Sequence, residues 1–298
     1  MKKNVAIIGA GPAGMAAALQ LQRFGIKTIL FEAQSQTGSL LKNAWRVENY
    51  LGMYPGRSGA NLLQIFRKNL ALNKIKMIGT KVESLDYDFK SRLFKIKTRD
   101  KKYSANYAIV ATGTKPKIFP LIENAEAFIR PYLFYEVFPI LKKRHKTVII
   151  IGAGDAAFDN ALNLAKNNKV IICNRSKSSS ALPLLIAKAA KHAGITYYQD
   201  YKPHSISPGV SKNLNCVFAG RKKHIAINAD YLVAATGHVP QKDFYADKLK
   251  LSEQKLIKSG QLFLIGDIKN NIYRQVAIAV GDGILAAMCI FDGLKKQC

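Results

Sequence analysis

The apolar and polar positions of this chain repeat one arrangement twice. Residues 4–9, NVAIIG, and residues 147–152, TVIIIG, are short apolar runs of the kind that form buried strands. Each run ends at a glycine and leads into a small-residue segment with helical spacing, and the first helix is expected to end near Phe24. A second apolar run, KTILFE at residues 27–32, follows that helix. Strand, loop, helix and strand in this order predict an α/β fold with parallel sheets.

Two further segments alternate apolar and polar residues between turn residues. They are residues 83–110 and 203–234, and their alternation is typical of antiparallel β-meanders. Each segment leads into a similar phrase, AIVATG at 108–113 and LVAATG at 232–237, which predicts a strand that runs into a tight turn. Each half of the chain should therefore combine a parallel sheet, helices and an antiparallel sheet. The predicted fold class is α/β, with two Rossmann-like domains of three layers (ββα).

The first glycine loop has the spacing Gly9-x-Gly11-x-x-Gly14 directly after its strand. Gly9 permits the tight turn, Gly11 lets backbone amides approach a pyrophosphate, and Gly14 allows close packing of the helix. Glu32, at the end of the next strand, stands where a carboxylate accepts hydrogen bonds from ribose hydroxyls. A glycine-rich turn in some other α/β protein is the alternative. The complete unit with its terminal acid favours a dinucleotide site.

The second glycine loop, Gly152 to Gly154, predicts a second nucleotide site. Counting from Gly152 the same number of residues that separate Gly9 from Glu32 leads to Arg175, and Lys177 follows. A cation at this position pairs with a 2′-phosphate, whereas a carboxylate would repel it. The site is therefore expected to prefer NADPH to NADH. The alternative is that Arg175 is one more surface base in a very basic chain.

The composition agrees with two folded domains and adds a strong positive charge. The chain has 298 residues, of which 48% are hydrophobic, enough for two cores of ordinary size. Lys and Arg outnumber Asp and Glu by 46 to 19, which gives a formal net charge of +27. The bases are dispersed apart from short runs such as 142–146 and 221–224, and such a field attracts phosphates, acidic proteins or anionic lipid. No aromatic and basic stripe accompanies them, so nucleic acid is not an expected partner.

The start of the chain and its cysteines bear on location and chemistry. Residues 1–22 superficially resemble a signal peptide, but their glycines form the nucleotide loop. No other apolar run approaches the roughly 20 residues that a membrane span requires, so we expect a cytoplasmic protein without a span. The four cysteines, Cys173, Cys216, Cys289 and Cys298, form no Cys-x-x-Cys pair. Neither a metal site nor a local redox dithiol is therefore expected.

Two longer segments carry a family resemblance. They are GSLLKNAWRVENYLGMYPGRSG at residues 38–59 and LFLIGDIKNNIYRQVAIAVGDGILAA at residues 262–287. With the two loops they resemble the two-domain flavoproteins of the pyridine nucleotide-disulfide oxidoreductase superfamily, and within it the low-molecular-weight thioredoxin reductases. The resemblance covers nearly the whole chain. It implies FAD and NADPH, with an NAD(P)H-binding domain at 116–239 inserted into an FAD-binding domain formed by 1–115 and 240–298.

The resemblance also implies which residues meet each cofactor. In that family a Gly-Asp pair binds the ribityl and phosphate part of FAD, and an Arg-Gln-Val run lies beside the flavin ring. The residues expected at FAD are Gly9, Gly11, Pro12, Ala13, Gly14, Glu32, Ala33, Gly38, Asn49, Val82, Ala111, Gly113, Gly266, Asp267, Arg274, Gln275 and Val276. Those expected at NADPH are Gly152, Gly154, Asp155, Ala156, Arg175, Lys177 and Gly237. Relatives in the family form homodimers, so a homodimer is expected.

One chemical feature of the thioredoxin reductases is missing from this chain. Those enzymes carry a Cys-x-x-Cys shortly before the second glycine loop, because two thiols must take electrons from the flavin and exchange with a substrate disulfide. Tyr135 and Phe138 stand there in this chain, so thioredoxin reduction by that route is not expected. Residues 134–148 and 154–162 are similar to the ferredoxin or flavodoxin NADP reductases of thioredoxin-reductase type, which lack the dithiol.

These features predict an FAD-dependent NAD(P)H oxidoreductase in which the flavin carries the chemistry and no side chain acts as a catalytic residue. A small acidic electron carrier, ferredoxin or flavodoxin, is the favoured acceptor, because the positive charge would steer it. A quinone or a low-molecular-weight disulfide is the alternative acceptor. Two other hypotheses stay open: a disulfide reductase that uses a distant thiol, Cys298 or Cys173, and a non-enzymatic flavoprotein redox sensor.

Several side chains admit two interpretations. Trp45 either stacks on the isoalloxazine or lines an acceptor pocket, or else it packs in a core. His238 is either a proton donor near the flavin or a structural turn residue, with the second favoured. Cys298 is better explained as a free terminal thiol than as a redox group. Asp155 and Asp159, at the start of the second helix, are expected to stabilise the helix dipole rather than to catalyse.

Overall fold

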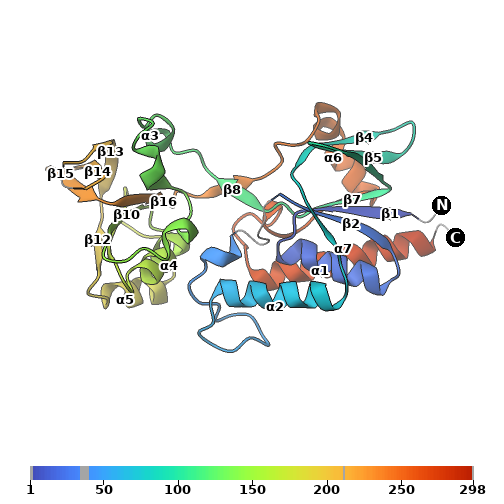
Figure 1. Ribbon diagram of the computed structural model, residues 1–298, viewed down its shortest axis with the longest axis horizontal. Coiled ribbons are helices and arrows are strands. Elements are labelled where there is room, and N and C mark those ends of the chain that lie inside the picture. Colours follow the sequence, from blue (N-terminus) through green and yellow to red (C-terminus); the bar gives the residue numbers. More distant parts are fainter. Residues whose placement is uncertain (1–2, 34–39, 211, 297–298) are drawn as a thin grey trace. The chain divides into compact units, whose positions relative to one another are not determined.

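The computed structural model describes residues 3–33, 40–210 and 212–296, and contacts divide the chain into two compact units. Unit 1 consists of Met1–Lys42, Val47–Lys115 and Val239–Cys298. Unit 2 consists of Asn43–Arg46 and Pro116–His238. Each unit contains a parallel sheet, helices and an antiparallel sheet (Figure 1).

Unit 1 is built on a five-stranded parallel sheet. In spatial order its strands are β18 (Leu262–Leu264), β7 (Tyr107–Val110), β1 (Asn4–Ile8), β2 (Lys27–Glu32) and β3 (Met77–Gly79). Helices α1 (Pro12–Arg23), α2 (Gly59–Leu72) and α7 (Val276–Lys295) cover one face (Figure 1). Helix α6 (Asp247–Lys258) and the antiparallel strands β4 (Val82–Asp88), β5 (Leu93–Thr98) and β6 (Lys102–Ala105) cover the other.

The layers of unit 1 explain its apolar runs. Strand β1 is covered on both faces, and a strand of this kind reads as a continuous apolar segment. Ala6 and Ile8 of β1 belong to the core that fills the space beneath β4, β5 and β6, together with Leu85 and Phe94. On the opposite face α7 packs so closely on α1 that a Cβ on Gly283 would lie 2.2 Å from the Ala13 carbonyl oxygen. The predicted ββα layering is confirmed in this unit.

Helix α7 is, within the described ranges, the one helix long and apolar enough to cross a membrane. Its 20 residues include a window with a mean hydropathy of 1.8. The sequence interpretation overlooked this run, which Asp282 interrupts. Length and composition alone do not distinguish a membrane span from a packed helix, and α7 packs on α1 through Gly283. The expectation that the chain has no span stays a prediction.

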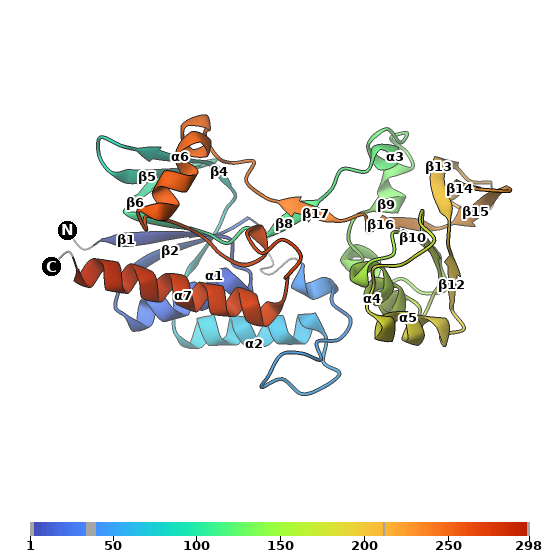
Figure 2. The ribbon, with the colours of Figure 1, turned by 180° about the vertical axis from the view of Figure 1, so that it is seen from behind.

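Unit 2 repeats the plan of unit 1. The spatial order of its parallel strands is β12 (Ile195–Tyr198), β11 (Lys169–Cys173), β10 (Thr147–Ile151), β16 (Tyr231–Ala234) and β9 (Leu133–Phe134). Helices α4 (Asp155–Leu164) and α5 (Pro183–Ala190) lie on one face, and α3 (Pro120–Glu123) lies on the other with the antiparallel strands β13 (Tyr201–Pro208), β14 (Leu214–Gly220) and β15 (His224–Ala229) (Figure 2).

Short elements complete the chain. Strands β8 (Thr114–Pro116) and β17 (His238–Pro240), where the chain passes from one unit to the other, pair in a two-stranded sheet. Single-turn 3-10 helices are η1 (Leu41–Asn43), η2 (Arg130–Tyr132), η3 (Phe138–Ile140) and η4 (Gly266–Ile268).

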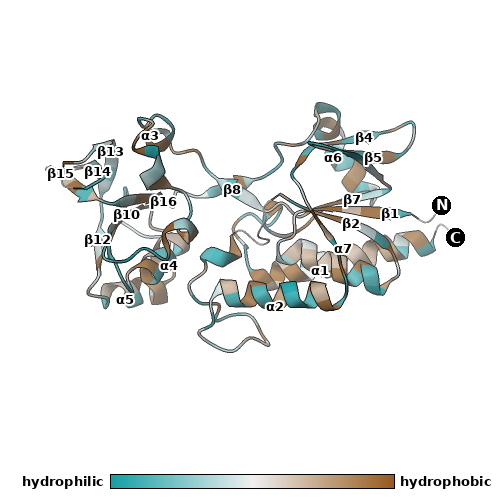
Figure 3. Cartoon of the chain, in the orientation of Figure 1, coloured by the Kyte–Doolittle hydropathy of each residue, from teal (hydrophilic) through white to brown (hydrophobic). Residues whose placement is uncertain are grey.

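Strand β10 shows why its sequence is an unbroken apolar run. Its alternate residues enter two different cores: Val148 and Ile150 pack with α4, whereas Ile149 and Ile151 pack with the antiparallel sheet. Neither face of the strand meets water, so a polar residue would be buried on either side. Figure 3 shows the same concentration of apolar residues in the central strands of each unit.

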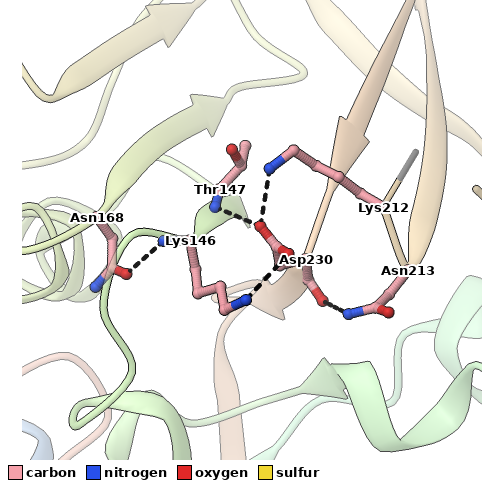
Figure 4. Close-up of polar contacts among 6 residues, drawn as sticks. All are labelled: Lys146, Thr147, Asn168, Lys212, Asn213 and Asp230. Atoms are coloured by element: carbon pink, nitrogen blue, oxygen red, sulfur yellow. Dashed lines mark hydrogen bonds and ion pairs between the residues drawn. The ribbon is translucent and has the colours of Figure 1, made fainter.

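A buried carboxylate, directly before β16, binds the first residue of the neighbouring central strand β10. Asp230, between β15 and β16, accepts hydrogen bonds from the Thr147 amide at 2.7 Å and from the Lys212 ammonium at 3.0 Å (Figure 4). Lys146 lies 3.8 Å from the second carboxylate oxygen. Burial by itself raises the pKa of the Asp230 carboxyl, but the amide and the two ammonium groups outweigh burial and hold that pKa below its ordinary value.

Replacing Asp230 with Asn should lower the free energy of unfolding of unit 2 by about 2 kcal/mol at neutral pH, because Lys212 loses its buried counter-charge. The folded-state pKa lies below the unfolded-state value of about 3.9. The charge-dependent stabilisation is therefore present above the unfolded pKa and is lost as the pH falls through the folded pKa. Urea unfolding followed by the fluorescence of Trp45, the only tryptophan and a residue of unit 2, measures this difference.

Asp200→Asn is the matched control, because Asp200 pairs at 2.7 Å with Arg221, whose side chain is 66% exposed. A pair of this kind contributes little, so D200N should leave stability nearly unchanged. A D230N effect that is the same size in acid as at neutral pH would contradict the assignment to charge.

Candidate functional site

A cavity of about 520 Å³ lies in unit 1 at the carboxyl ends of the parallel strands. This end of a parallel sheet is where α/β proteins bind ligands. The turn after β1, the end of β2 and the turn after β7 line the cavity on one side, and the segment from β18 to the start of α7 lines it on the other. Residues from both ends of the chain thus meet in one pocket.

The glycine loop of unit 1 forms the floor of this cavity. Gly9 has φ +103°, and a Cβ there would lie 2.5 Å from the Ala111 carbonyl oxygen. A Cβ on Gly14 would lie 1.9 Å from the Gly9 carbonyl oxygen. A Cβ on Gly11, by contrast, would meet nothing within 4 Å, so this glycine faces open space. The loop therefore presents bare backbone at the N-terminus of α1, where a pyrophosphate is favoured.

The expected acid stands at the end of β2. Glu32 lines the cavity, and its carboxylate accepts a hydrogen bond of 2.9 Å from the Ala10 amide of the glycine loop. The side chain is thereby held over the loop, with oxygen atoms placed to accept bonds from a ribose.

Most residues expected at FAD share this pocket. The lining includes Gly9, Gly11, Pro12, Ala13, Glu32, Ala33, Val82, Ala111, Gly113, Gly266, Asp267, Arg274, Gln275 and Val276. Gly14 lies beneath the loop, and Asn49 is connected to the pocket through a 2.8 Å hydrogen bond to the Gln275 side chain. Gly38 lies outside the described residues.

Two buried donors in the pocket wall test whether FAD fits. Arg274 Nε and the Thr114 hydroxyl are buried, and neither has a hydrogen-bond partner among the described residues. Both residues line the cavity. Buried donors are almost always paired, so their arrangement calls for a ligand that carries acceptors. The bare glycine loop, the Glu32 carboxylate that is placed to bind a ribose, and these two donors together fit FAD.

A residue that the sequence interpretation missed holds the Gly-Asp turn in place. Asp282 of α7 accepts hydrogen bonds from the Gly266 amide at 2.9 Å and the Asn270 side chain at 2.8 Å, and it pairs with Lys269 at 3.0 Å. Burial raises the pKa of the neighbouring Asp267 carboxyl; Arg274 opposes the rise, and the charge of Asp282 adds to it. Asp282 thus positions Gly266 and helps to raise the pKa of the Asp267 carboxyl.

The second glycine loop, in unit 2, has the geometry of the first. Gly152 has φ +129°, and a Cβ there would lie 2.3 Å from the Ala235 carbonyl oxygen at the end of β16. Gly154 precedes α4, and the Asp155 carboxylate accepts a 2.7 Å hydrogen bond from the Leu182 amide. Asp155 therefore fixes the segment that leads into α5, a role that the dipole interpretation did not include.

Strand register corrects the position that was counted for Arg175. Ile8 pairs with Phe31 in unit 1 and Ile151 pairs with Cys173 in unit 2, so the residue equivalent to Glu32 is Asn174. Arg175 is the next residue, because the second copy has one residue fewer between its glycine and its strand end. Arg175 and Lys177 are both exposed in the turn that follows β11. Gly237 lies near the end of Pro116–His238, the second of the two segments that form unit 2.

The positions where relatives would carry a dithiol hold two aromatic residues. The Tyr135 hydroxyl accepts a 2.9 Å hydrogen bond from the Phe119 amide and donates one of 2.8 Å to Glu123. The Phe138 amide donates to the Asn43 side chain at 3.0 Å. Burial, with a contribution from Glu123, raises the pKa of the tyrosine hydroxyl. Neither side chain can exchange with a disulfide.

Two of the described thiols are unable to replace that dithiol. Cys173 and Cys216 are fully buried in the core beneath the antiparallel sheet of unit 2. Burial raises the pKa of each thiol to about 12, so both are protonated at neutral pH and poor nucleophiles. Cys289 is exposed on α7, and Cys298 lies outside the described residues. Cys173 is therefore excluded as the distant thiol of a disulfide reductase.

Trp45 packs in unit 2 rather than in the cavity wall. Its ring borders the core of α4, and its amide donates a 2.9 Å hydrogen bond to the Asp159 carboxylate. Arg46, Lys166 and Lys188 lie 4.6, 5.6 and 5.9 Å from the ring centroid. The structure therefore agrees with the interpretation that Trp45 packs in a core, and cation–π contacts with the three bases stabilise that packing.

Replacing Asp282 with Ala should weaken FAD binding about tenfold, because the Gly266 amide and Lys269 lose a charged acceptor and the turn is no longer held. Flavin fluorescence during titration of deflavinated protein with FAD measures this affinity. Asp292→Ala is the control, since Asp292 is an exposed carboxylate on the same helix. Equal affinity of wild type and D282A would exclude the positioning role.

Comparisons with known proteins agree with this geometry. A profile of the family described as pyridine nucleotide-disulphide oxidoreductase matches residues 3–283. The thioredoxin reductase of Rickettsia felis is 27% identical over 326 residues, covering 98% of this chain and 98% of that protein. The thioredoxin reductase of Chlamydia pneumoniae is 27% identical over 301 residues, covering 95% of this chain and 96% of that protein.

Solved structures share the fold. Thioredoxin reductase of Lactococcus lactis in its FR conformation has a TM-score of 0.85 at 24% identity, covering 99% of this chain and all of that one. Bacillithiol disulfide reductase of Bacillus cereus has a TM-score of 0.74 at 19% identity and covers 98% of this chain. The profile match over nearly the whole sequence shows that the chain belongs to the pyridine nucleotide-disulphide oxidoreductase family, as a thioredoxin reductase-like oxidoreductase that uses FAD and NADPH.

Proposed function

We propose that this protein transfers electrons from NADPH through FAD to an external acceptor without a protein dithiol, and that the acceptor is a small acidic electron carrier of the ferredoxin or flavodoxin kind. The observation that carries the proposal is the pair Tyr135 and Phe138 at the dithiol positions of a chain that has both nucleotide cradles. When bound, FAD supplies the hydride acceptance and the electron transfer.

The chain's own residues bind and orient under this proposal. The glycine loop and the N-terminus of α1 hold the pyrophosphate, and Glu32 holds the ribose. Gly266 and Asp267 hold the ribityl and phosphate part, and Arg274 supplies a buried donor. In unit 2, Arg175 and Lys177 meet the 2′-phosphate of the coenzyme. No side chain is assigned a proton transfer.

The net charge favours an acidic acceptor. A formal charge of +27 produces a positive field that raises the rate of encounter with an acidic protein. A quinone gains nothing from this field because it carries no charge. The buried, protonated thiols Cys173 and Cys216 offer no relay to a disulfide substrate. Their free state also suits a cytoplasmic location.

The proposal includes a homodimer that forms through α7. One side of this helix packs on α1, yet Ile278, Leu285 and Met288 are 40%, 57% and 46% exposed. Their spacing places them on one face of the helix. Large exposed apolar faces are rare on monomers and mark interaction surfaces.

NADPH should bleach the visible flavin absorbance in anaerobic solution, and the reduced protein should then pass electrons to ferredoxin or flavodoxin, followed as cytochrome c reduction. The carrier rate should fall several-fold when salt rises from about 0.05 to about 0.5 M, because screening shortens the reach of the field. A neutral quinone, whose encounter with the protein does not depend on charge, is the control for flavin turnover in each buffer.

Each alternative has its own outcome in this experiment. If neither nicotinamide coenzyme bleaches the flavin, the protein is a flavoprotein sensor and the proposal is lost. If the flavin is bleached but only a quinone or a low-molecular-weight disulfide is reduced, the carrier is the wrong acceptor. Loss of disulfide reduction in a Cys289→Ala or Cys298→Ala variant would restore the distant-thiol hypothesis.

Replacing both Leu285 and Met288 with Lys should convert a dimer to a monomer, because two charges would be buried in an apolar interface. Light scattering after gel filtration measures the mass. Leu251→Lys is the control, since this residue of α6 is 90% exposed. A wild-type protein that is monomeric at micromolar concentration would refute this part of the proposal.

A further inference from the structure

One buried amide holds the turn that follows β11. Asn174 is 4% exposed, although the residues after it are exposed. Its side-chain nitrogen donates hydrogen bonds of 2.9 Å to the Ser178 carbonyl and 2.9 Å to the Tyr197 hydroxyl. Its side-chain oxygen accepts a 3.0 Å bond from the Ser176 amide. One side chain therefore closes the turn from Asn174 to Ser178 on itself and fastens it to β12.

Backbone bonds fix the start of this turn to the sheet. The Asn174 amide donates to the Tyr198 carbonyl at 2.8 Å, and the Asn174 carbonyl accepts from the Tyr201 amide at 2.9 Å. The Ser176 carbonyl accepts from the Asp200 amide at 3.2 Å. The first half of the turn is thus joined to the segment between β12 and β13.

The far end of the turn is tied to the second glycine loop. The Ser179 hydroxyl donates to the Ala153 carbonyl at 2.6 Å, and the Ser180 amide donates to the same oxygen at 3.2 Å. Arg175 and Lys177 therefore project from a turn that is held at both ends, beside the loop that receives the coenzyme pyrophosphate. A cation on a fixed backbone loses less entropy when it meets a phosphate than one on a mobile loop.

The position of Asn174 has a chemical meaning as well. It is the unit 2 equivalent of Glu32, whose carboxylate reaches over the first glycine loop to the Ala10 amide. Asn174 is neutral, and its side-chain nitrogen already donates to the Ser178 carbonyl in the turn and to the Tyr197 hydroxyl of β12. A carboxylate at this strand end would repel a 2′-phosphate, and a short neutral side chain turned into the protein removes that repulsion.

We propose that Asn174 is a positioning residue that sets the preference of the second site for a 2′-phosphorylated coenzyme, by holding Arg175 and Lys177 in place without itself touching the ligand. This inference rests on the proposed binding of NADPH through Arg175. Through Arg175 and Lys177, Asn174 affects only the binding of the 2′-phosphate, which distinguishes NADPH from NADH.

A structural brace without this role would behave differently. Loss of a fold-stabilising bond in unit 2 weakens the binding of both coenzymes alike, because both use the glycine loop. Loss of the proposed role weakens only ligands that carry the 2′-phosphate. The ratio of the two affinities separates these cases, and it does not depend on how much active protein a preparation contains.

The test measures the affinity of the FAD-loaded protein for 2′,5′-ADP and for 5′-AMP by calorimetry, together with the KM for NADPH and for NADH. Asn174→Ala should weaken 2′,5′-ADP about tenfold, because the cations must be ordered on binding, and should change 5′-AMP less than about twofold. Asn174→Asp should weaken 2′,5′-ADP further by adding a negative charge. The kcat at saturating NADPH should stay near the wild-type value.

Two variants keep the test decisive if N174A folds poorly. Tyr197→Phe removes one partner of Asn174 and keeps the ring that packs edge-on against Phe158 at 5.3 Å, so it should show a smaller shift of the same ratio. Asn168→Ala is the matched control: Asn168 is a buried amide of unit 2 that accepts from the Lys146 amide (Figure 4). It also donates to the Lys143 and Leu164 carbonyls. N168A should lower stability and leave the ratio unchanged.

Arg175→Ala separates this inference from the function on which it rests. If R175A leaves 2′,5′-ADP affinity unchanged, the proposed NADPH recognition fails whatever Asn174 does. If R175A weakens 2′,5′-ADP but N174A and Y197F do not, only the role of Asn174 is overturned. Equal weakening of both probes in N174A would make Asn174 a fold brace and would overturn the inference too.

Discussion

Both nucleotide cradles depend on one steric constraint: the first residue after the central strand must pass the backbone of the neighbouring strand without a Cβ. At Gly9 a Cβ would lie 2.5 Å from the Ala111 carbonyl oxygen, and at Gly152 it would lie 2.3 Å from that of Ala235. Real Cβ atoms do not approach so closely, so any side chain would push the two strand ends apart. Because the strand ends stay together, the turn after β7 lies beside the glycine loop and contributes Ala111 to the cavity wall.

This constraint is visible in the sequence, which is why so much of the fold could be predicted from it. Apolar runs locate β1, β2 and β10 because those strands are buried on both faces, and the glycine spacing locates the turns. Asp282 leaves no comparable signal. Its bond to the Gly266 amide joins a turn to a helix 16 residues further along the chain, and neither periodicity nor spacing encodes that approach. The same holds for Asp230, whose partners are Thr147 at the start of β10 and Lys212 in the turn between β13 and β14.

The displaced count at Arg175 shows a different limit. A number of residues measured along one copy transfers to the other only if the helix between the strands has the same length. Strand pairing gives the correspondence directly: Phe31 is the last residue of β2 that pairs with β1, and Cys173 is the last residue of β11 that pairs with β10, so Glu32 and Asn174 correspond. The apolar runs that end at these residues were readable in the sequence. What could not be read was that Asn174 turns inward, since that depends on Tyr197.

Two physical properties bear on the choice of acceptor: the burial of the thiols, and the distance over which the positive field of the protein acts. Tyr135 and Phe138 carry no thiol, and Cys173 and Cys216 are buried and protonated, so none of these four side chains can carry electrons onward as a thiolate. Under the proposed function an acceptor takes electrons from the flavin directly. At physiological salt the field decays over about 8 Å, so it hastens encounter but does not choose between acidic partners. Under the proposed function that choice falls to short-range contacts between the acceptor and the residues around the cavity.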